Sequence, residues 1–106
     1  LFKLEEGLRT KNKEFHIPIL QVLVNHGGEV DFSKLIEELK KELAGVLNPV
    51  DWETLSDGKT IRWVNNVGWA KARLRNDGYI SATAPIGTWQ ITEKGRQVLE
   101  ESKKKQ

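Results

Sequence analysis

The chain contains neither cysteine nor methionine among its 106 residues. Without cysteine it can form no disulfide and no thiolate metal site, and a protein free of disulfides suits the cytoplasm, which is the location we expect. The chain begins with leucine instead of an initiator methionine, so we also expect it to be part of a longer protein.

Long apolar runs are also missing. No stretch approaches the roughly 18 consecutive apolar residues of a membrane span, and the first residues carry charges where a secretory signal would be apolar. The composition, 38% hydrophobic and 30% charged, is that of an ordinary globular domain. The sequence therefore predicts a folded domain with no membrane partner.

Motifs that carry catalysis are absent as well. There is no glycine-rich phosphate loop, nucleophile elbow or paired His/Glu helix motif. His16 and His26 have no acidic or second histidine partner at ligand spacing, so we predict no metal and no other cofactor. Asp51 and Glu53 could belong to a metal-dependent nuclease, but no Glu-x-Lys strand follows, and acidic residues are simply favourable at a helix start. We predict no catalytic residue in this chain.

Charge is distributed unevenly along the sequence. Residues 27–58 hold three Lys/Arg against eight Asp/Glu, whereas residues 59–80 hold five against one, giving segment charges of −5 and +4. Such asymmetry is typical of a protein that presents one face to a polyanion. A mixed solvated surface is the alternative explanation.

Apolar periodicity predicts a helical core. Leu1, Leu4 and Leu8 suggest a short lead-in helix, within a lead-in and linker segment 1–13. Pro18 fits the first turn of the next helix, which Gly27-Gly28 ends, and Asp31 is the expected N-cap of a second. The stripes predicted for these two helices are Ile19, Leu20, Leu23 and Val24, and Phe32, Leu35, Ile36, Leu39 and Leu43.

The second half of the chain adds a third long helix and a hairpin. Asn48-Pro49 predicts a short helix that carries Trp52, and a long helix is expected over 60–77, ended by Gly78. Segments 79–83 and 88–92, joined by 84–87, predict a hairpin, and Thr92 caps a last helix. We place the domain at 14–102, with a frayed tail at 103–106.

This order predicts a mainly α fold with a small β-hairpin, namely a winged helix-turn-helix with a three-helix core and a wing. One feature departs from the minimal motif, whose helices are joined by about 3–4 residues. Here about 15 residues, with an extra short helix around Trp52, precede the third long helix.

The third helix has two chemically different faces. Trp63, Val67, Ala70 and Leu74 fall on one side and are expected in the core. The other side offers groups that suit the major groove, because Asn can pair with adenine and Arg with guanine or phosphate. The predicted DNA-binding residues are Lys59, Thr60, Arg62, Asn65, Asn66, Trp69, Arg73 and Asn76, together with Thr83, Ile86 and Thr88 of the wing.

Each of these residues has an ordinary structural explanation too. Asn65 and Asn66 are poor helix formers, which favours contact with DNA, although contacts inside the protein are the alternative. The arginines could be solvated charges. An exposed indole is unfavourable, so we expect Trp69 to be buried beneath the Trp52 segment, with exposure toward the groove as the alternative. Trp52 and Trp89 are expected in the core.

Three stretches, FHIPILQVLVNHGGEV, DGKTIRWVNNVGWAKARLRNDGYI and GTWQITEKGRQVL, resemble the N-terminal domain of Mrr-type restriction-system proteins. The resemblance covers roughly residues 14–100 and includes the long segment between the helices. It rests on the proline of the first helix, Gly-Trp-Ala of the third, Gly-Tyr-Ile after it and Trp-x-Ile-Thr-x-x-Gly of the wing. Family members often carry a basic residue before the wing glycine, where this chain has Ile86.

The resemblance implies a module that targets double-stranded DNA for a nuclease domain in the full-length protein, in a modification-dependent restriction system that attacks modified, typically methylated, foreign DNA. The hydrophobic wing tip weakens the expectation of contact between wing and phosphate. A stand-alone transcription regulator of the same fold is one alternative. A protein-interaction module, docking through Trp69 and the acidic second helix, is another.

Overall fold

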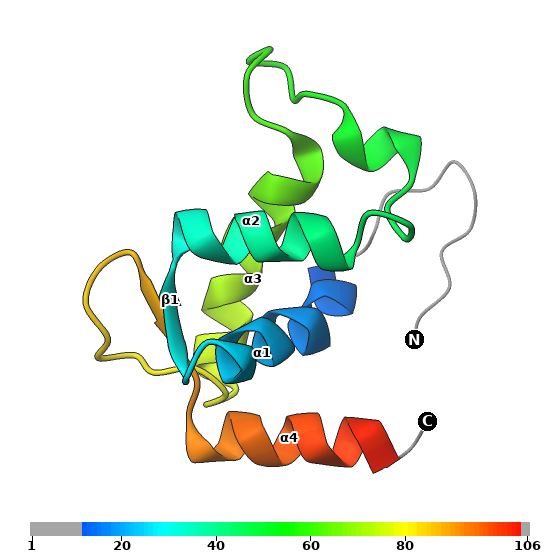
Figure 1. The fold of residues 1–106 in the computed structure, drawn as a ribbon. Coiled ribbons are helices and arrows are strands. Elements are labelled where there is room, and N and C mark those ends of the chain that lie inside the picture. Colours follow the sequence, from blue (N-terminus) through cyan, green and yellow to red (C-terminus); the bar gives the residue numbers. More distant parts are fainter. Residues whose placement is uncertain (1–11, 105–106) are drawn as a thin grey trace.

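A computed structural model describes residues 12–104 of the chain, so the predicted lead-in helix on Leu1, Leu4 and Leu8 lies outside the described residues. Within them, α1 lies between α2 and α4, with α3 packed behind (Figure 1). The elements are the 3₁₀ helix η1 (Asn12–Phe15), α1 (His16–Asn25), β1 (Glu29–Asp31), α2 (Phe32–Glu42), the 3₁₀ helix η2 (Pro49–Trp52), α3 (Arg62–Asn76), β2 (Thr88–Gln90) and α4 (Glu93–Lys104). The predicted winged helix-turn-helix fold, mainly helical with a small two-stranded sheet, is confirmed.

The predicted apolar stripes meet in one core. Those of α1 and α2 are confirmed, except that Val24, Phe32 and Ile36 are only partly buried against it. Asp31 caps α2 as predicted, since its carboxylate accepts a hydrogen bond from the Lys34 backbone N–H at 2.7 Å. The buried apolar side chains are Phe15, Ile19, Leu20, Val22, Leu23, Val30, Leu35, Leu39, Leu43, Trp63, Val67, Ala70, Leu74, Ile80, Trp89, Ile91 and Leu99.

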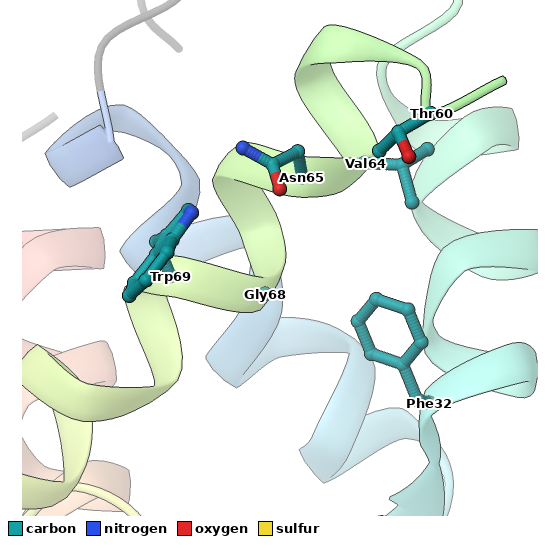
Figure 2. Close-up of a pocket in the computed structure, with 6 residues that line it drawn as sticks. All are labelled: Phe32, Thr60, Val64, Asn65, Gly68 and Trp69. Atoms are coloured by element: carbon teal, nitrogen blue, oxygen red, sulfur yellow. The ribbon is translucent and has the colours of Figure 1, made fainter. Parts of the chain in front are cut away.

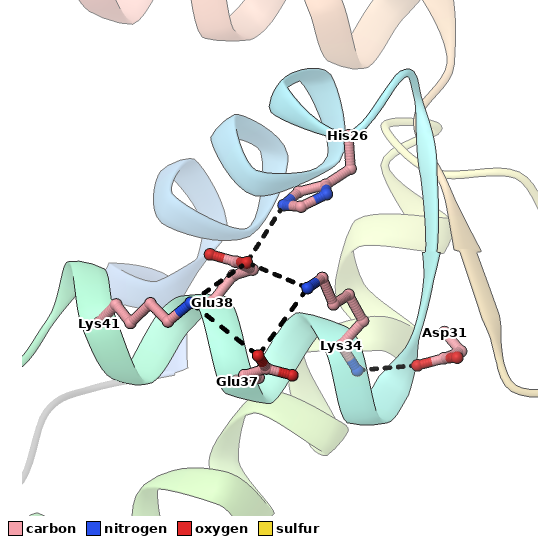
Figure 3. Close-up of polar contacts among 6 residues, drawn as sticks. All are labelled: His26, Asp31, Lys34, Glu37, Glu38 and Lys41. Carbon is pink, nitrogen blue, oxygen red and sulfur yellow. Dashed lines mark hydrogen bonds and ion pairs between the residues drawn. The ribbon is translucent and has the colours of Figure 1, made fainter.

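The polar face of α2 is an ion-pair network (Figure 3). Glu38 lies 3.4 Å from the Lys34 ammonium, 3.7 Å from that of Lys41 and 3.6 Å from the His26 ring. Although desolvation acts to raise it, the hydrogen bond from Lys34 and the positive charges nearby lower the pKa of Glu38. The charge of Glu38 is therefore largely balanced by lysines of the same helix, with the His26 ring at the end of α1 nearby.

The long segment before α3 is built around η2. The Asn48 backbone N–H donates to the Asp51 carboxylate at 2.9 Å, and Asp51 is fully buried, so this residue serves the turn. Trp52 was expected in the core. Its ring packs edge-on against Trp63, with centroids 5.6 Å apart, but 38% of the residue stays exposed because η2 lies at the margin of the domain.

The wing differs from the predicted hairpin. β2 pairs antiparallel with β1, with Val30 opposite Trp89, and segment 79–83 meets 88–92 only through an isolated bridge between Ile80 and Ile91. The strand predicted at 79–83 is therefore wrong. After Ile80 the chain bends, because the Ser81 hydroxyl accepts the Thr83 backbone N–H and Pro85 has no N–H to extend a ladder.

The ends of the last two helices are close to prediction. Gly78 ends α3 with φ +81°, a conformation that suits glycine, and Thr92 caps α4 by accepting the Gly95 N–H. The Thr92 hydroxyl donates in turn to the Gly78 carbonyl and so joins the two ends. α4 runs to Lys104, so residues 103 and 104, predicted as frayed, are helical.

Candidate nucleic-acid interface

The start of α3 is set by a turn around Asp57. Its carboxylate accepts the backbone N–H groups of Lys59 and Thr60, each at 2.9 Å, and the Thr60 hydroxyl. These hydrogen bonds, that of the Thr60 hydroxyl above all, lower the pKa of Asp57. Lys59 and Thr60 therefore lie in the turn, and α3 begins at Arg62 instead of the predicted residue 60. The Lys59 side chain is exposed.

The inward face of α3 is as predicted. Trp63, Val67, Ala70 and Leu74 are each at most 1% exposed and lie in the core. Because a helix turns by about 100° per residue, this side fixes which residues face solvent. We call the opposite side the outward face of α3; it carries Asn65, Gly68, Trp69, Ala72 and Asn76.

Trp69 is the main correction on this face. We expected the indole to be buried beneath the Trp52 segment, but Trp69 is 69% exposed. Trp52 packs on Trp63 instead. Trp69 follows Trp63 by six residues, which is a rotation of about 240° around the helix, so its side chain points away from that contact. The indole is therefore available on the same surface as Asn65.

The other predicted residues of α3 lie on a flank and not on the outward face. Arg62, Asn66 and Arg73 share this flank, at i, i+4 and i+11. The Arg73 Nε lies 3.1 Å from the Asp77 carboxylate, with 71% of the side chain exposed. Arg62 is half-buried, and its Nε is buried without a hydrogen-bond partner among the described residues.

Arg75 is a residue that the sequence reasoning missed. It is exposed and lies seven positions after Gly68, so it extends the outward side of α3 by two turns. Within residues 12–104 it has no ion pair. The seven-residue spacing between Gly68 and Arg75 already predicts from the sequence that the two residues lie on the same side of the helix.

An open hollow adjoins the outward face (Figure 2). It has a volume of about 410 Å³ and lies where the start of α2 faces the first half of α3. Gly68 keeps it open, because a Cβ built there would meet nothing within 4 Å. The residues that line the hollow are Phe32, Thr60, Val64, Asn65, Gly68 and Trp69, none of which is charged.

The wing offers an uncharged surface. Residues 80–92 contain no Asp, Glu, Lys or Arg. Ile86 is fully exposed at the tip, Thr83 is exposed and Thr88 is half-buried. The Gly87 carbonyl accepts the Phe32 backbone N–H at 3.1 Å, which ties the wing to the first turn of α2. The wing thus reaches the same end of the domain as the hollow.

Titratable groups of the described residues form no cluster of three or more His, Cys, Asp or Glu side chains suited to a metal ion. Partial burial lowers the pKa of His16, assisted by Arg73 and opposed by Asp77. Of the helices described, none combines the length and the apolar character that crossing a bilayer requires.

Comparison with protein families places most of the chain in a known family. The family model described as the Mrr N-terminal domain matches residues 13–101. The chain belongs to the Mrr N-terminal domain family. The predicted resemblance is therefore confirmed, including the long segment around η2, which falls inside the match. No curated protein and no solved structure matched the chain.

Proposed function

We propose that this Mrr N-terminal domain, residues 14–102, binds double-stranded DNA and directs a nuclease domain of the full-length protein to it. The observation that carries the proposal is the sidedness of α3. The helix buries its four inward residues, carries amide and indole side chains on its outward face and places arginines at the edges of that face. A recognition helix of a winged helix-turn-helix protein presents this chemistry to the major groove.

Two sets of contacts follow from this placement. Asn65, central on the outward face, suits bidentate pairing with adenine, and Asn76 lies on the same side about three turns later. Lys59 and the flank residues Arg62, Asn66 and Arg73 suit phosphates on the groove rim, as Arg75 does on the opposite edge. The uncharged wing, with Thr83, Ile86 and Thr88, adds little to charge neutralisation.

A titration with labelled duplex tests the proposal. Residues 59–80 offer about 4–6 phosphate contacts, so affinity is expected to fall steeply between 50 mM and 200 mM salt. Binding that is absent, or indifferent to salt, contradicts DNA binding. The chain alone is expected not to cut DNA when Mg²⁺ is added, because no carboxylate set was found in the sequence for a metal-dependent cut. A nuclease domain in the full-length gene would distinguish a restriction protein from a transcription regulator.

A protein-interaction module is the second candidate, and the exposure of Trp69 beside an apolar hollow favours it. α2 supports it less, because its three glutamates are matched by three lysines and because Lys34, Lys41 and His26 already surround Glu38. A dock of this kind would bind its partner without duplex DNA, so the same titration separates the two functions.

A further inference from the structure

The hollow beside Asn65 has the chemistry of one particular part of a base pair. Phe32, Val64 and Gly68 give it apolar walls, and Asn65 stands on its rim (Figure 2). No charged side chain lines it, so it is a poor site for a phosphate. Asn65 lines the hollow and also lies on the outward face of α3. A group that enters the hollow therefore lies next to this residue.

The major-groove edge of an A·T pair carries these two features together. Adenine offers the N7 acceptor and the N6 donor, which a side-chain amide pairs with, and thymine offers its 5-methyl group at the other end of the same edge. A G·C pair offers no methyl group there. The juxtaposition of one amide and one apolar hollow on α3 thus matches an A·T pair better than the alternatives.

We infer that the hollow formed by Phe32, Val64 and Gly68 receives the 5-methyl group of a thymine whose adenine is bound by Asn65. The inference rests on the proposed function and names its specificity. Gly68 is the determining residue, because any side chain at this position would occupy the space that the methyl group enters. Burying one methyl group corresponds to about a fourfold gain in affinity.

The test begins with the 106-residue chain and a randomised duplex pool, from which bound duplexes are enriched. In an enriched duplex each thymine is then replaced in turn by deoxyuridine, which removes only the 5-methyl group. We expect about a fourfold loss of affinity at one thymine paired with a required adenine, and no change at the others. A parallel series carries 5-methylcytosine in place of cytosine.

Two glycine variants locate the effect in the protein. Gly68→Ala is expected to fold, since its Cβ meets nothing within 4 Å and alanine favours the helix. The variant should bind the thymine-containing and the uracil-containing duplex with equal affinity. That affinity should be at least the affinity of the unmodified protein for the uracil-containing duplex. Gly45→Ala adds the same methyl group to the loop after α2, also into open space, and should keep the fourfold difference.

Several results would overturn this inference. Equal binding of thymine and uracil at every position would do so, as would a Gly68→Ala variant that keeps the full difference. A methyl effect confined to 5-methylcytosine would remove the assignment to thymine. If duplexes bind with steep salt dependence in each of these cases, the proposed DNA binding stands. If no duplex is bound under any condition, the proposed function fails and this inference with it.

Discussion

The Lys71 ammonium of α3 lies 5.3 Å from the centre of the Trp89 indole ring, and the Phe32 ring of α2 stacks on the same indole with centroids 6.0 Å apart. Trp89 of β2 thereby contacts one residue each of α3 and α2. These two contacts hold the base of the wing and the first turn of α2 against α3. They therefore shape the end of the domain that carries the hollow.

We expect Lys71→Gln to lower the free energy of unfolding by about 0.5–1 kcal/mol, the contribution of a cation over an aromatic ring near the surface. Thermal or urea unfolding measures this. Lys40→Gln on the exposed face of α2 is the matched control, and it should change stability by less than about 0.5 kcal/mol. Equal effects of the two substitutions would show that the contact with Trp89 contributes nothing.

Two helical glycines should respond oppositely to alanine. A Cβ at Gly95 would overlap the Tyr79 carbonyl oxygen, so Gly95→Ala must push α4 away and should destabilise the domain by about 1–3 kcal/mol. Gly68→Ala meets open space and should stabilise it by about 0.5–1 kcal/mol. Urea unfolding of both variants checks this, and a stable Gly95→Ala protein would contradict the packing of α4 on Tyr79.

The arginines of α3 are expected to act without regard to sequence. Arg73→Ala and Arg75→Ala should each weaken binding to all duplexes alike and make the dependence of log affinity on log salt shallower by about one unit. Arg62→Ala should do the same, but its buried Nε requires a check of the fold by circular dichroism. A loss confined to one preferred duplex would instead place these arginines on base edges.

Asn65→Ala should behave in the opposite way. It is expected to lose about 1–3 kcal/mol of binding free energy on a preferred duplex and little on others, because a bidentate contact to adenine carries sequence preference. Ile86→Ala, at the tip of the wing, should change binding little. A folded Asn65→Ala variant that binds like the parent, beside an Ile86→Ala variant that fails to bind, would move recognition from α3 to the wing.

His16 predicts a pH dependence of stability. Partial burial lowers its pKa from 6.5, so the unfolded chain takes up a proton at a higher pH than the folded one. The contribution of neutral His16 to the free energy of unfolding should thus be fully present above about pH 7. It should decline as the pH falls from there toward the lowered pKa of the folded state. His16→Gln should flatten the melting temperature across this window, whereas a slope that persists unchanged would exclude His16 as its origin.

The helical part of the fold could be predicted from the sequence because its signals are local. The spacing of Trp63, Val67, Ala70 and Leu74 defines the buried side of α3, and Asp31 and Thr92 are caps that act within three residues. What failed depended on distant neighbours. All three residues of β2 pair with β1, whereas segment 79–83 adds only the isolated bridge between Ile80 and Ile91, and nothing local reveals β1 as the partner.

The same reason explains the outcome for the candidate site. Which of two tryptophans the η2 segment covers depends on how that segment returns to α3. It returns over Trp63, so the preference for burying Trp69 was wrong. The hollow could not be predicted from the sequence either, because it forms only where Phe32 of α2 faces Gly68 of α3. Periodicity alone does show that Arg75 shares a side with Gly68.

The pairing of Asp31 with Thr88 has a consequence for how this domain can be taken apart. The two strands are separated in sequence by α2, η2 and α3, so the sheet joins two parts of the chain that are far apart in sequence. A segment that starts after β1 would contain the whole wing sequence and still lack the strand that supports it. The wing is thus a product of the complete helical core, and grafting residues 80–92 onto another scaffold would not transfer its shape.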